Sequence, residues 1–303
     1  PGRLLRGGVV ENTVQARAVR VAGECEAFPR SYFSVVCCDE GDIAAEAIEV
    51  ICEHELTIVA NGCELATLMC SNANLSELVY GFLFSEGVIG DVREVVAFDM
   101  DAARRIARLS LSHPVRRPAA PVITSGFGGK ALAAPSGRFL PSLAVGTGAC
   151  SLPETLPVPT PGDIDLIRGA VMAMRVGARE YAATRGTHCS ALFCRDEMVA
   201  LYEDIGRHNT FDKLAGHCLT RGIDATGFLL ATTGRVSSEM LRKAARLGVG
   251  TVASLSGPTD AAVREARGRG MTLAGYVNSS RLTLYAASTV TAVPEAVTMS
   301  MLP

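Results

Sequence analysis

The last third of the chain alternates strand-like and helix-like segments, and this alternation constrains the fold more than any other feature. Buried-strand patterns occur at 227–233 (GFLLATT), 251–256 (TVASLS) and 271–277 (MTLAGYV). Helical patterns fill both gaps, at 237–248 and 258–270. A β-α-β-α-β order with right-handed crossovers places the three strands parallel in one sheet. The sequence therefore predicts an α/β fold for this region.

The composition is that of a globular protein. Hydrophobic residues make up 48% of the 303 residues, charged residues make up 20%, and the formal net charge is −2. A nucleic-acid surface or an anionic-membrane surface would require a basic excess. No apolar run reaches the roughly 18–20 residues that span a bilayer. We therefore expect no nucleic-acid partner and no membrane association.

Ten cysteines are spread along the chain, and no two of them have C-x-x-C spacing. No Cys/His cluster follows zinc-ligand spacing, and so we expect no permanently bound metal. Several cysteines lie inside apolar strand patterns, which is typical of reduced, buried thiols in a cytoplasmic protein. The H-x-E and P-C-x-x-C motifs of zinc deaminases are absent, and so is the G-x-S-x-G motif of serine hydrolases.

The N-terminal half predicts a smaller α+β domain over residues 43–125, after a poorly structured extension over 1–42. Two strand-like runs flank Asn61-Gly62, which is the strongest short signal for a β-hairpin. A helix with one apolar face follows and ends near Gly87. The stretch 92–124 is strand-rich.

A Gly-, Pro- and Ser-rich segment at 126–162 separates this domain from the larger α/β domain at 163–290. We expect the segment to be the most mobile internal stretch, lying over the mouth of the ligand site. In the larger domain a helix begins at Asp163, and a hairpin turns at Asp196-Glu197. Residues 291–303 form a tail.

Two polar turns follow the predicted parallel strands, where α/β sheets bind ligands. Each turn leads into a helix N-terminus, whose free N–H groups and positive dipole attract anions. The alternative is that Ser237 and Thr259 only cap their helices. The candidate residues of a phosphate site in these turns are Thr233, Gly234, Arg235, Ser237, Ser256 and Thr259.

A cluster of charged residues occupies YEDIGRHNTFDK at 202–213. One interpretation is an ordinary helix start with surface ion pairs. The other is a polar cluster in which Asp204 orients Arg207 or His208 toward a ligand. His188, at the mouth of the preceding hairpin, is a further candidate, although a lone histidine is more often structural.

Six stretches together resemble the FdhD/NarQ family of formate dehydrogenase accessory proteins. They are NGCELATLMCS, LVYGFLFSEGVI, TRGTHCSALF, EDIGRHNTFDKL, TTGRVSSEMLRKAARLGV and LAGYVNSSRLTLY, in order across roughly 55–285. The resemblance implies a cytidine-deaminase-like α/β fold without the deaminase zinc. It also implies a sulfur carrier that takes sulfur from a cysteine desulfurase as a persulfide. The sulfur goes to a molybdenum bis(guanine dinucleotide) cofactor, which then enters formate dehydrogenase.

The resemblance also assigns site residues. It places the cofactor along Tyr276, Val277, Asn278, Ser279, Ser280 and Arg281. It implies a persulfide-forming cysteine in the glycine turn SGFGGK at 125–130, where this chain has Phe127 and, at the second cysteine position, Lys130. Phenylalanine cannot form a persulfide. Two hypotheses follow: Cys150, on the same segment, is a substitute thiol, or the chain is a cofactor-binding chaperone without sulfur chemistry. We also expect a homodimer.

Overall fold

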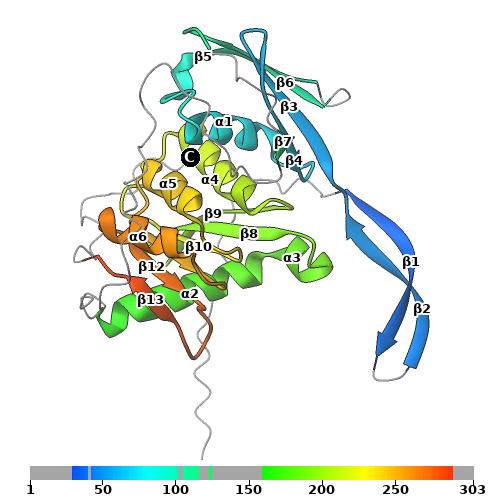
Figure 1. Ribbon diagram of the computed structural model, residues 1–303, viewed down its shortest axis with the longest axis vertical. Coiled ribbons are helices and arrows are strands. Elements are labelled where there is room, and N and C mark those ends of the chain that lie inside the picture. The colour runs from blue at the N-terminus through cyan, green and yellow to red at the C-terminus, as the bar shows by residue number, and fades with distance from the viewer. Residues whose placement is uncertain (1–28, 40–41, 102–104, 116–122, 125–158, 289–303) are drawn as a thin grey trace, which may run out of the picture.

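The structure is a computed structural model that describes residues 29–39, 42–101, 105–115, 123–124 and 159–288. Two sheets with their helices form the body, and a long two-stranded hairpin extends from it (Figure 1). This mixed α/β architecture confirms the predicted fold class. The predicted boundaries between the domains stay predictions.

The larger sheet has six strands in the order β13-β12-β11-β10-β8-β9. The strands β10 (Leu229–Thr232), β11 (Thr251–Ser254) and β12 (Thr272–Gly275) are parallel, as the alternation predicts. Antiparallel strands complete the sheet: β8 (His188–Cys194) and β9 (Glu197–Asp204) on one side and β13 (Thr283–Ala286) on the other. The β8–β9 hairpin turns at Arg195-Asp196, one residue before the predicted position, because β9 already begins at Glu197.

Helices cover both faces of this sheet (Figure 1). One face packs against α2 (Pro161–Gly177), which is followed by the short helix α3 (Arg179–Thr184). The other face packs against α4 (Arg207–Arg221), α5 (Ser238–Arg246) and α6 (Asp260–Gly268). The predicted start of α2 at Asp163 is two residues after the observed start at Pro161. Thr160 is the N-cap and Asp163 completes a capping box, so the helix begins at Pro161.

The smaller sheet has the strand order β5-β6-β3-β4-β7. Its strands are β3 (His54–Ala60), β4 (Cys63–Cys70), β5 (Val95–Asp101), β6 (Ile106–Leu111) and β7 (Ile123–Thr124), with the 3-10 helix η1 (Val92–Glu94) before β5. The hairpin at Asn61-Gly62 is confirmed, since both residues have positive φ, 50° and 76°. Helix α1 (Leu75–Ser85) buries its apolar face on this sheet, and Gly87 follows it with φ 73°.

Helices α1 and α4 join the two sheets backbone to backbone. A Cβ added at Gly81 would lie 1.6 Å from the Asp212 carbonyl oxygen, and one added at Gly216 would lie 1.9 Å from the Glu77 carbonyl oxygen. Only glycine therefore fits at either position of this crossing. Neither glycine was predicted to be a packing residue.

Buried ion pairs lie beside this crossing. Lys213 Nζ is 2.6 Å from Asp204, and both side chains are fully buried. The same Asp204 carboxylate accepts hydrogen bonds from the backbone N–H and hydroxyl of Ser71, at the end of β4. Removing one partner of such a pair leaves an uncompensated buried charge, typically at a cost of about 3–5 kcal/mol. These contacts connect the end of β4, in the smaller sheet, to β9 of the larger sheet and to α4.

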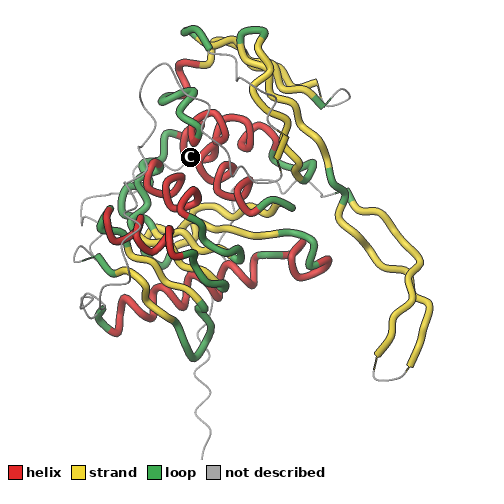
Figure 2. The backbone as a smooth tube through the Cα atoms, viewed as in Figure 1, coloured by secondary structure: helices red, strands yellow, loops and turns green. Residues whose placement is uncertain are grey.

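The prediction that residues 1–42 are poorly structured is wrong for the part of this range that the structure describes. Residues Arg30–Asp39 form β1, which pairs along its whole length with β2 (Asp42–Ile51). Figure 2 shows this hairpin as an arm that leaves the body. The sequence signal for this hairpin, which was missed, is the pairs Tyr32-Phe33 and Val35-Val36, because aromatic and β-branched residues favour strands. Both faces of the hairpin carry apolar side chains, and so the alternation of a half-buried strand is absent.

Residues 1–28, 125–158 and 289–303 are among those outside the described part. The expected mobile segment lies almost wholly within the second of these ranges, together with Phe127, Lys130 and Cys150. Among the helices of the described residues, none is both long and apolar enough to cross a membrane.

Candidate functional site

Three loops meet at one edge of the larger sheet, beyond the carboxyl ends of β10, β11 and β12. Ser254 Oγ donates to the Gly234 carbonyl at 2.8 Å, and Ser256 Oγ donates to the Thr233 carbonyl at 2.9 Å. The third loop joins through the N–H of Val277, which donates to the Ser254 carbonyl at 3.0 Å. The predicted adjacency of the first two turns is confirmed, because parallel strands end at the same edge.

The residues that were also predicted as helix caps do cap their helices. Ser237 accepts from the N–H of Met240, and Thr259 accepts from the N–H of Ala262. The two caps lie close together, since Thr259 donates its N–H to the Val236 carbonyl at 2.9 Å. The N-termini of α5 and α6 therefore open on the same edge of the sheet. Arg235, two residues before the Ser237 cap, is exposed.

Tyr276 has an unusual backbone conformation in this cluster. Its φ is 52°, in the left-handed region that bulky residues rarely adopt. Its ring lies against Gly257, where an added Cβ would be 2.5 Å from the tyrosine Oη. The side chain is still 54% exposed, and so it presents an aromatic surface beside the two polar turns. Backbone strain of this kind concentrates at ligand sites.

The rest of the third loop is a compact turn organised by Asn278. The Asn278 Oδ1 accepts from the N–H groups of Ser280 and Arg281 at 3.0 and 2.8 Å. Arg168, on α2, donates to the Ser280 carbonyl at 3.1 Å. Ser279 and the Arg281 side chain are exposed, while Val277 is buried in the core. Within the stretch 276–281 that was predicted to bind the cofactor, Val277 therefore packs in the core.

His188 and Arg207 join the three loops from the neighbouring strand and helix. His188 Nδ1 is 3.3 Å from Thr233 Oγ1, because β8 runs antiparallel to β10 and begins where β10 ends. Gly234 lies against both residues: a Cβ there would be 3.0 Å from Arg207 Cβ and 3.4 Å from His188 Nδ1. The structure thus brings these predicted site residues together.

A layer of buried hydroxyl groups supports the site from below. Ser190 Oγ lies 2.7 Å from Thr210 Oγ1 and donates to Thr232 Oγ1 at 2.9 Å. Thr210 in turn donates to the Arg207 carbonyl at 2.8 Å. This chain of contacts fixes the first turn of α4 relative to β10.

The electrostatics of the site favour an anionic ligand. Burial lowers the pKa of His188, and the adjacent Arg207 guanidinium lowers it further, so the imidazole is neutral at pH 7. Arg207 carries the positive charge, and its buried Nε has no hydrogen-bond partner among the described residues. A buried donor without a partner is costly, and a bound oxygen acceptor would satisfy it.

His208 and Asp204 do not have the predicted roles, in which Asp204 orients Arg207 or His208 toward a ligand. His208 is buried, with Nδ1 3.2 Å from Glu239 Oε1, and so it braces α4 against α5 and presents little surface to a ligand. Asp204 binds Ser71, Lys213, Asn209 and the Gly206 N–H, and it forms no hydrogen bond or ion pair with Arg207 or His208. The alternative of surface ion pairs is also wrong, since these groups are buried.

Glu239 and Gly257 are the site residues that sequence reasoning missed. Glu239 lies in the first turn of α5, two residues after the Ser237 cap, and this position was its only signal. The role of Gly257 depends on the ring of a residue 19 positions later, and no local pattern encodes that contact.

The thiols near the site are poor nucleophiles. Cys189, whose N–H donates to Thr233 Oγ1, is fully buried, and burial raises the pKa of its thiol well above the usual range. Burial also raises the pKa values of Cys70 and Cys218 to about 12. Such thiols are protonated at neutral pH. Within the described residues, no group of three or more His, Cys, Asp and Glu side chains is arranged to hold a metal ion.

Comparisons with known proteins agree with the motif pattern. The model of the FdhD/NarQ family matches residues 51–291. The chain is 36% identical to the sulfur carrier protein FdhD of Geobacillus kaustophilus, over 81% of this chain and 90% of that protein. It is 31% identical to the sulfur carrier protein FdhD of Bacillus subtilis, over 82% and 92%.

A solved structure shares the fold. It is a crystal structure from Desulfotalea psychrophila of a protein assigned as a formate dehydrogenase accessory protein, with a TM-score of 0.63 and 20% identity. The similarity covers 85% of this chain and 97% of that one. The family model spans most of the chain, and the relatives exceed 30% identity along nearly their whole length. The chain therefore belongs to the FdhD/NarQ family.

Proposed function

We propose that this protein is a cytoplasmic sulfur carrier in the maturation of formate dehydrogenase. It would accept sulfur from a cysteine desulfurase as a persulfide and pass it to the molybdenum bis(guanine dinucleotide) cofactor as its client. The names of the relatives support the carrier role. The observation that carries the proposal is the meeting of three loops, one of which lies against Arg207, whose Nε lacks a hydrogen-bond partner in the described part of the chain.

The chemistry of the site suits the diphosphate and base of a guanine dinucleotide. Arg207, with the exposed Arg235 and Arg281, can donate charge-assisted hydrogen bonds to phosphate oxygens. The N-termini of α5 and α6 add backbone N–H donors and the positive ends of two helix dipoles. Tyr276 offers an exposed aromatic face for stacking on a base.

The carrying thiol in this proposal is Cys150. The buried thiols Cys70, Cys189 and Cys218 are excluded by their raised pKa values. Cys150 lies on the same Gly-rich segment as Phe127, among small residues. Its thiolate would attack the outer sulfur of the desulfurase persulfide. The sulfur–sulfur bond then breaks, the desulfurase cysteine leaves as a thiolate, and the persulfide remains on Cys150.

Phe127 favours a second candidate, a chaperone that holds the cofactor without sulfur chemistry. The site at the three loops is the same in both cases. The two candidates differ in whether the protein takes up sulfur, and that difference can be measured directly.

The cofactor site is tested by titrating guanosine diphosphate into the purified protein by calorimetry. Replacing Arg207 by Ala removes a charge-assisted hydrogen bond, and we expect a loss of about 1.5–3 kcal/mol of binding free energy. Arg195→Ala is the matched control, because Arg195 is an exposed arginine at the opposite end of β8. Equal affinity of the wild-type and Arg207→Ala proteins would contradict the placement of the diphosphate.

A further inference from the structure

Helices α4 and α5 contact each other through two pairs of polar side chains. In the first pair, His208 Nδ1 lies 3.2 Å from Glu239 Oε1. In the second, Lys243 Nζ donates to both oxygens of the Asp212 carboxylate, at 2.7 and 2.9 Å. The partners on each helix are four residues apart, and residues at this spacing lie on one face of a helix. The two helices therefore run in the same direction, with their N-termini next to each other.

The pair of His208 and Glu239 lies at the N-terminal ends of the two helices, beside the candidate site. His208 directly follows Arg207 in the first turn of α4, and Glu239 is two residues after the Ser237 cap of α5. The exposed fractions of the His208 and Glu239 side chains are only 4% and 18%. Apart from their mutual contact, neither His208 Nδ1 nor Glu239 Oε1 has a hydrogen-bond partner among the described residues. Loss of either side chain would leave the other polar atom buried without a partner.

Electrostatics alone would push these two helix ends apart. The N-terminus of a helix carries a partial positive charge, so two adjacent N-termini repel each other. The first turn of α4 contains no acidic residue, and within the described residues no side chain caps it. Asp204 accepts from the Gly206 N–H just before this turn, but its charge is matched by Lys213 at 2.6 Å. Glu239, the acidic residue in the first turn of α5, therefore supplies the negative charge that offsets the repulsion.

We propose that His208 and Glu239 are positioning residues of the candidate site: their contact holds the first turn of α4, and with it Arg207, against the N-terminus of α5. This inference rests on the proposed function, because it concerns how the proposed phosphate-binding groups are held together. Neither side chain has to touch the ligand. The second pair, Asp212 with Lys243, holds the same two helices one turn further from the site.

The first test compares two substitutions of Glu239 by titration calorimetry with guanosine diphosphate and, separately, with inorganic pyrophosphate. Glu239→Ala removes the acceptor for His208, and we expect the affinity for each ligand to fall about tenfold. Glu239→Gln removes the charge but keeps an oxygen acceptor, and we expect it to recover the affinity to within about threefold of the wild type. Pyrophosphate lacks the base and the ribose, so equal losses for the two ligands locate the effect at the phosphates.

The same two variants separate positioning from a purely electrostatic role and from a purely structural one. If the Glu239 carboxylate acted on the ligand only through its charge, both variants would bind the anionic ligands more tightly than the wild type does. If the pair only stabilised the fold, Glu239→Ala would lower the melting temperature and leave both affinities unchanged. Either result overturns the proposal.

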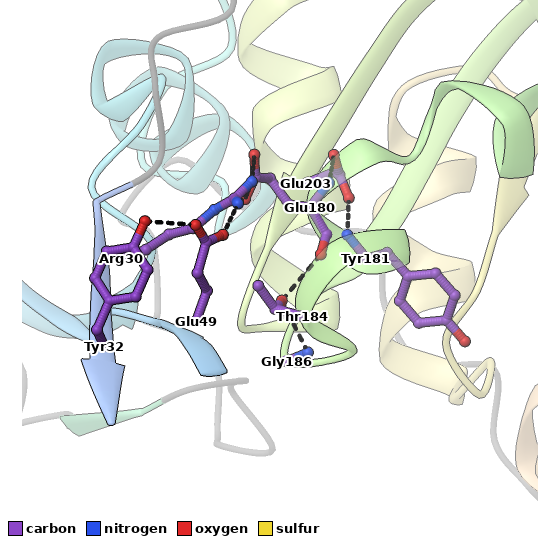
Figure 3. Close-up of polar contacts among 8 residues, drawn as sticks. All are labelled: Arg30, Tyr32, Glu49, Glu180, Tyr181, Thr184, Gly186 and Glu203. Atoms are coloured by element: carbon purple, nitrogen blue, oxygen red, sulfur yellow. Dashed lines mark hydrogen bonds and ion pairs between the residues drawn. The ribbon is translucent and has the colours of Figure 1, made fainter. Parts of the chain in front are cut away.

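Glu180→Ala is the matched control. Glu180 also lies in the first turn of a helix, α3, and pairs with a basic residue of another element, Arg30, at 2.9 and 3.0 Å (Figure 3). Helix α3 lies on the opposite face of the larger sheet from α4 and α5, where Tyr181 packs with α2. The variant keeps the cap of α3, because Glu203 accepts from the backbone N–H groups of residues 180 and 181 at 3.0 and 2.6 Å. We expect Glu180→Ala to bind both ligands as the wild type does.

The second test changes the other partner of the contact. Asparagine at position 208 places an amide N–H donor near the position of the histidine Nδ1, whereas alanine provides none. We therefore expect His208→Asn to bind guanosine diphosphate and pyrophosphate more tightly than His208→Ala, and His208→Ala to lose about tenfold in affinity. Equal affinities of the two His208 variants and the wild type would overturn the proposal.

Failure of this inference can be told apart from failure of the proposed function. If the wild type binds neither ligand, or if Arg207→Ala binds both as tightly as the wild type, the proposed site is wrong and the positioning role falls with it. If Arg207→Ala loses affinity while Glu239→Ala and His208→Ala do not, the site stands and only the positioning role is overturned.

Discussion

Gly234 lies directly against Arg207: a methyl group at position 234 would be 3.0 Å from Arg207 Cβ and 3.4 Å from His188 Nδ1. The loop after β10 and the first turn of α4 are thus in close contact at the candidate site. The absence of a side chain at position 234 leaves room for the aliphatic part of the Arg207 side chain, whose Cδ would lie 3.4 Å from an added Cβ.

This contact predicts that Gly234→Ala weakens ligand binding more than folding. The added methyl group would displace Arg207 from the proposed diphosphate position, and we expect the affinity for guanosine diphosphate to fall about tenfold. Titration calorimetry measures the change. Gly169→Ala is the control, because an added Cβ at Gly169 on α2 meets nothing within 4 Å. An unchanged affinity of Gly234→Ala would place the ligand elsewhere.

The positive φ and exposed ring of Tyr276 predict that substitutions at this position change the free energy of unfolding and the ligand affinity independently. Glycine adopts positive φ without steric cost, so Tyr276→Gly should raise the unfolding free energy relative to Tyr276→Ala by about 1 kcal/mol. Both variants lose the aromatic ring and should lose the same part of the guanosine diphosphate affinity. Urea denaturation and calorimetry on the two variants separate the effects. Equal stability of the two variants would show that the backbone at 276 is unstrained.

The glycine contact between α1 and α4 predicts a large loss of stability. Gly216→Ala forces the helices apart, because the new Cβ would lie 1.9 Å from the Glu77 carbonyl oxygen. We expect the unfolding free energy to fall by about 3 kcal/mol or more, at or beyond the upper end of overpacking costs. Urea denaturation tests this, with Gly169→Ala again as the helix-interior control. A loss below about 1 kcal/mol would mean that the two helices separate easily.

The larger sheet was predictable because its signals are local. Strand patterns and the Ser237 cap each depend on neighbouring residues, and parallel order then fixes which loops meet. In the smaller sheet, the Asn61-Gly62 turn is a local signal of the same kind. The arm was not predicted, because its apolar residues follow no single-face alternation. The buried pairs of Lys213 with Asp204 and of Lys243 with Asp212 were also missed. Charged residues usually lie on the surface, and only the tertiary fold shows that these do not.

The candidate site likewise contains residues whose positions could be predicted from the sequence and residues whose positions could not. Thr233, Ser256 and Tyr276 follow strands that the sequence shows, and so their meeting could be inferred. The position of Arg207 against Gly234, and of His208 against Glu239, depends on how α4 packs on the sheet. That packing is set by the α1–α4 crossing, which joins residues more than 130 positions apart.

Glu86 predicts a dependence of stability on pH. Burial raises the pKa of this carboxyl to about 7, although Lys243, 3.6 Å away, opposes the shift. A folded-state pKa above the unfolded value means that the folded protein holds a proton more tightly. The stability that Glu86 contributes is therefore present below about pH 4.5 and is lost as the pH rises to about 7.

Glu86→Gln should remove this dependence. Between pH 5 and 8 we expect the unfolding free energy of the wild type to fall relative to that of Glu86→Gln, by an amount on the order of 2–3 kcal/mol. Urea denaturation at several pH values gives the two curves. Glu197→Gln, at an exposed turn of β9, should follow the wild type. Parallel curves for wild type and Glu86→Gln would show that Glu86 is ionised throughout this range.

The most direct test of the proposed function is sulfur uptake. The purified protein is incubated with a cysteine desulfurase and cysteine labelled with radioactive sulfur, and the labelled residue is mapped on peptides separated without reductant. We predict label on the peptide that contains Cys150, and loss of that label in Cys150→Ser. Phe127→Cys is measured in parallel, because it places a thiol in the glycine turn, where the family resemblance implies the persulfide-forming cysteine. If neither the wild type nor Phe127→Cys takes up sulfur, the carrier function is contradicted, and cofactor binding without sulfur transfer is the account that stands.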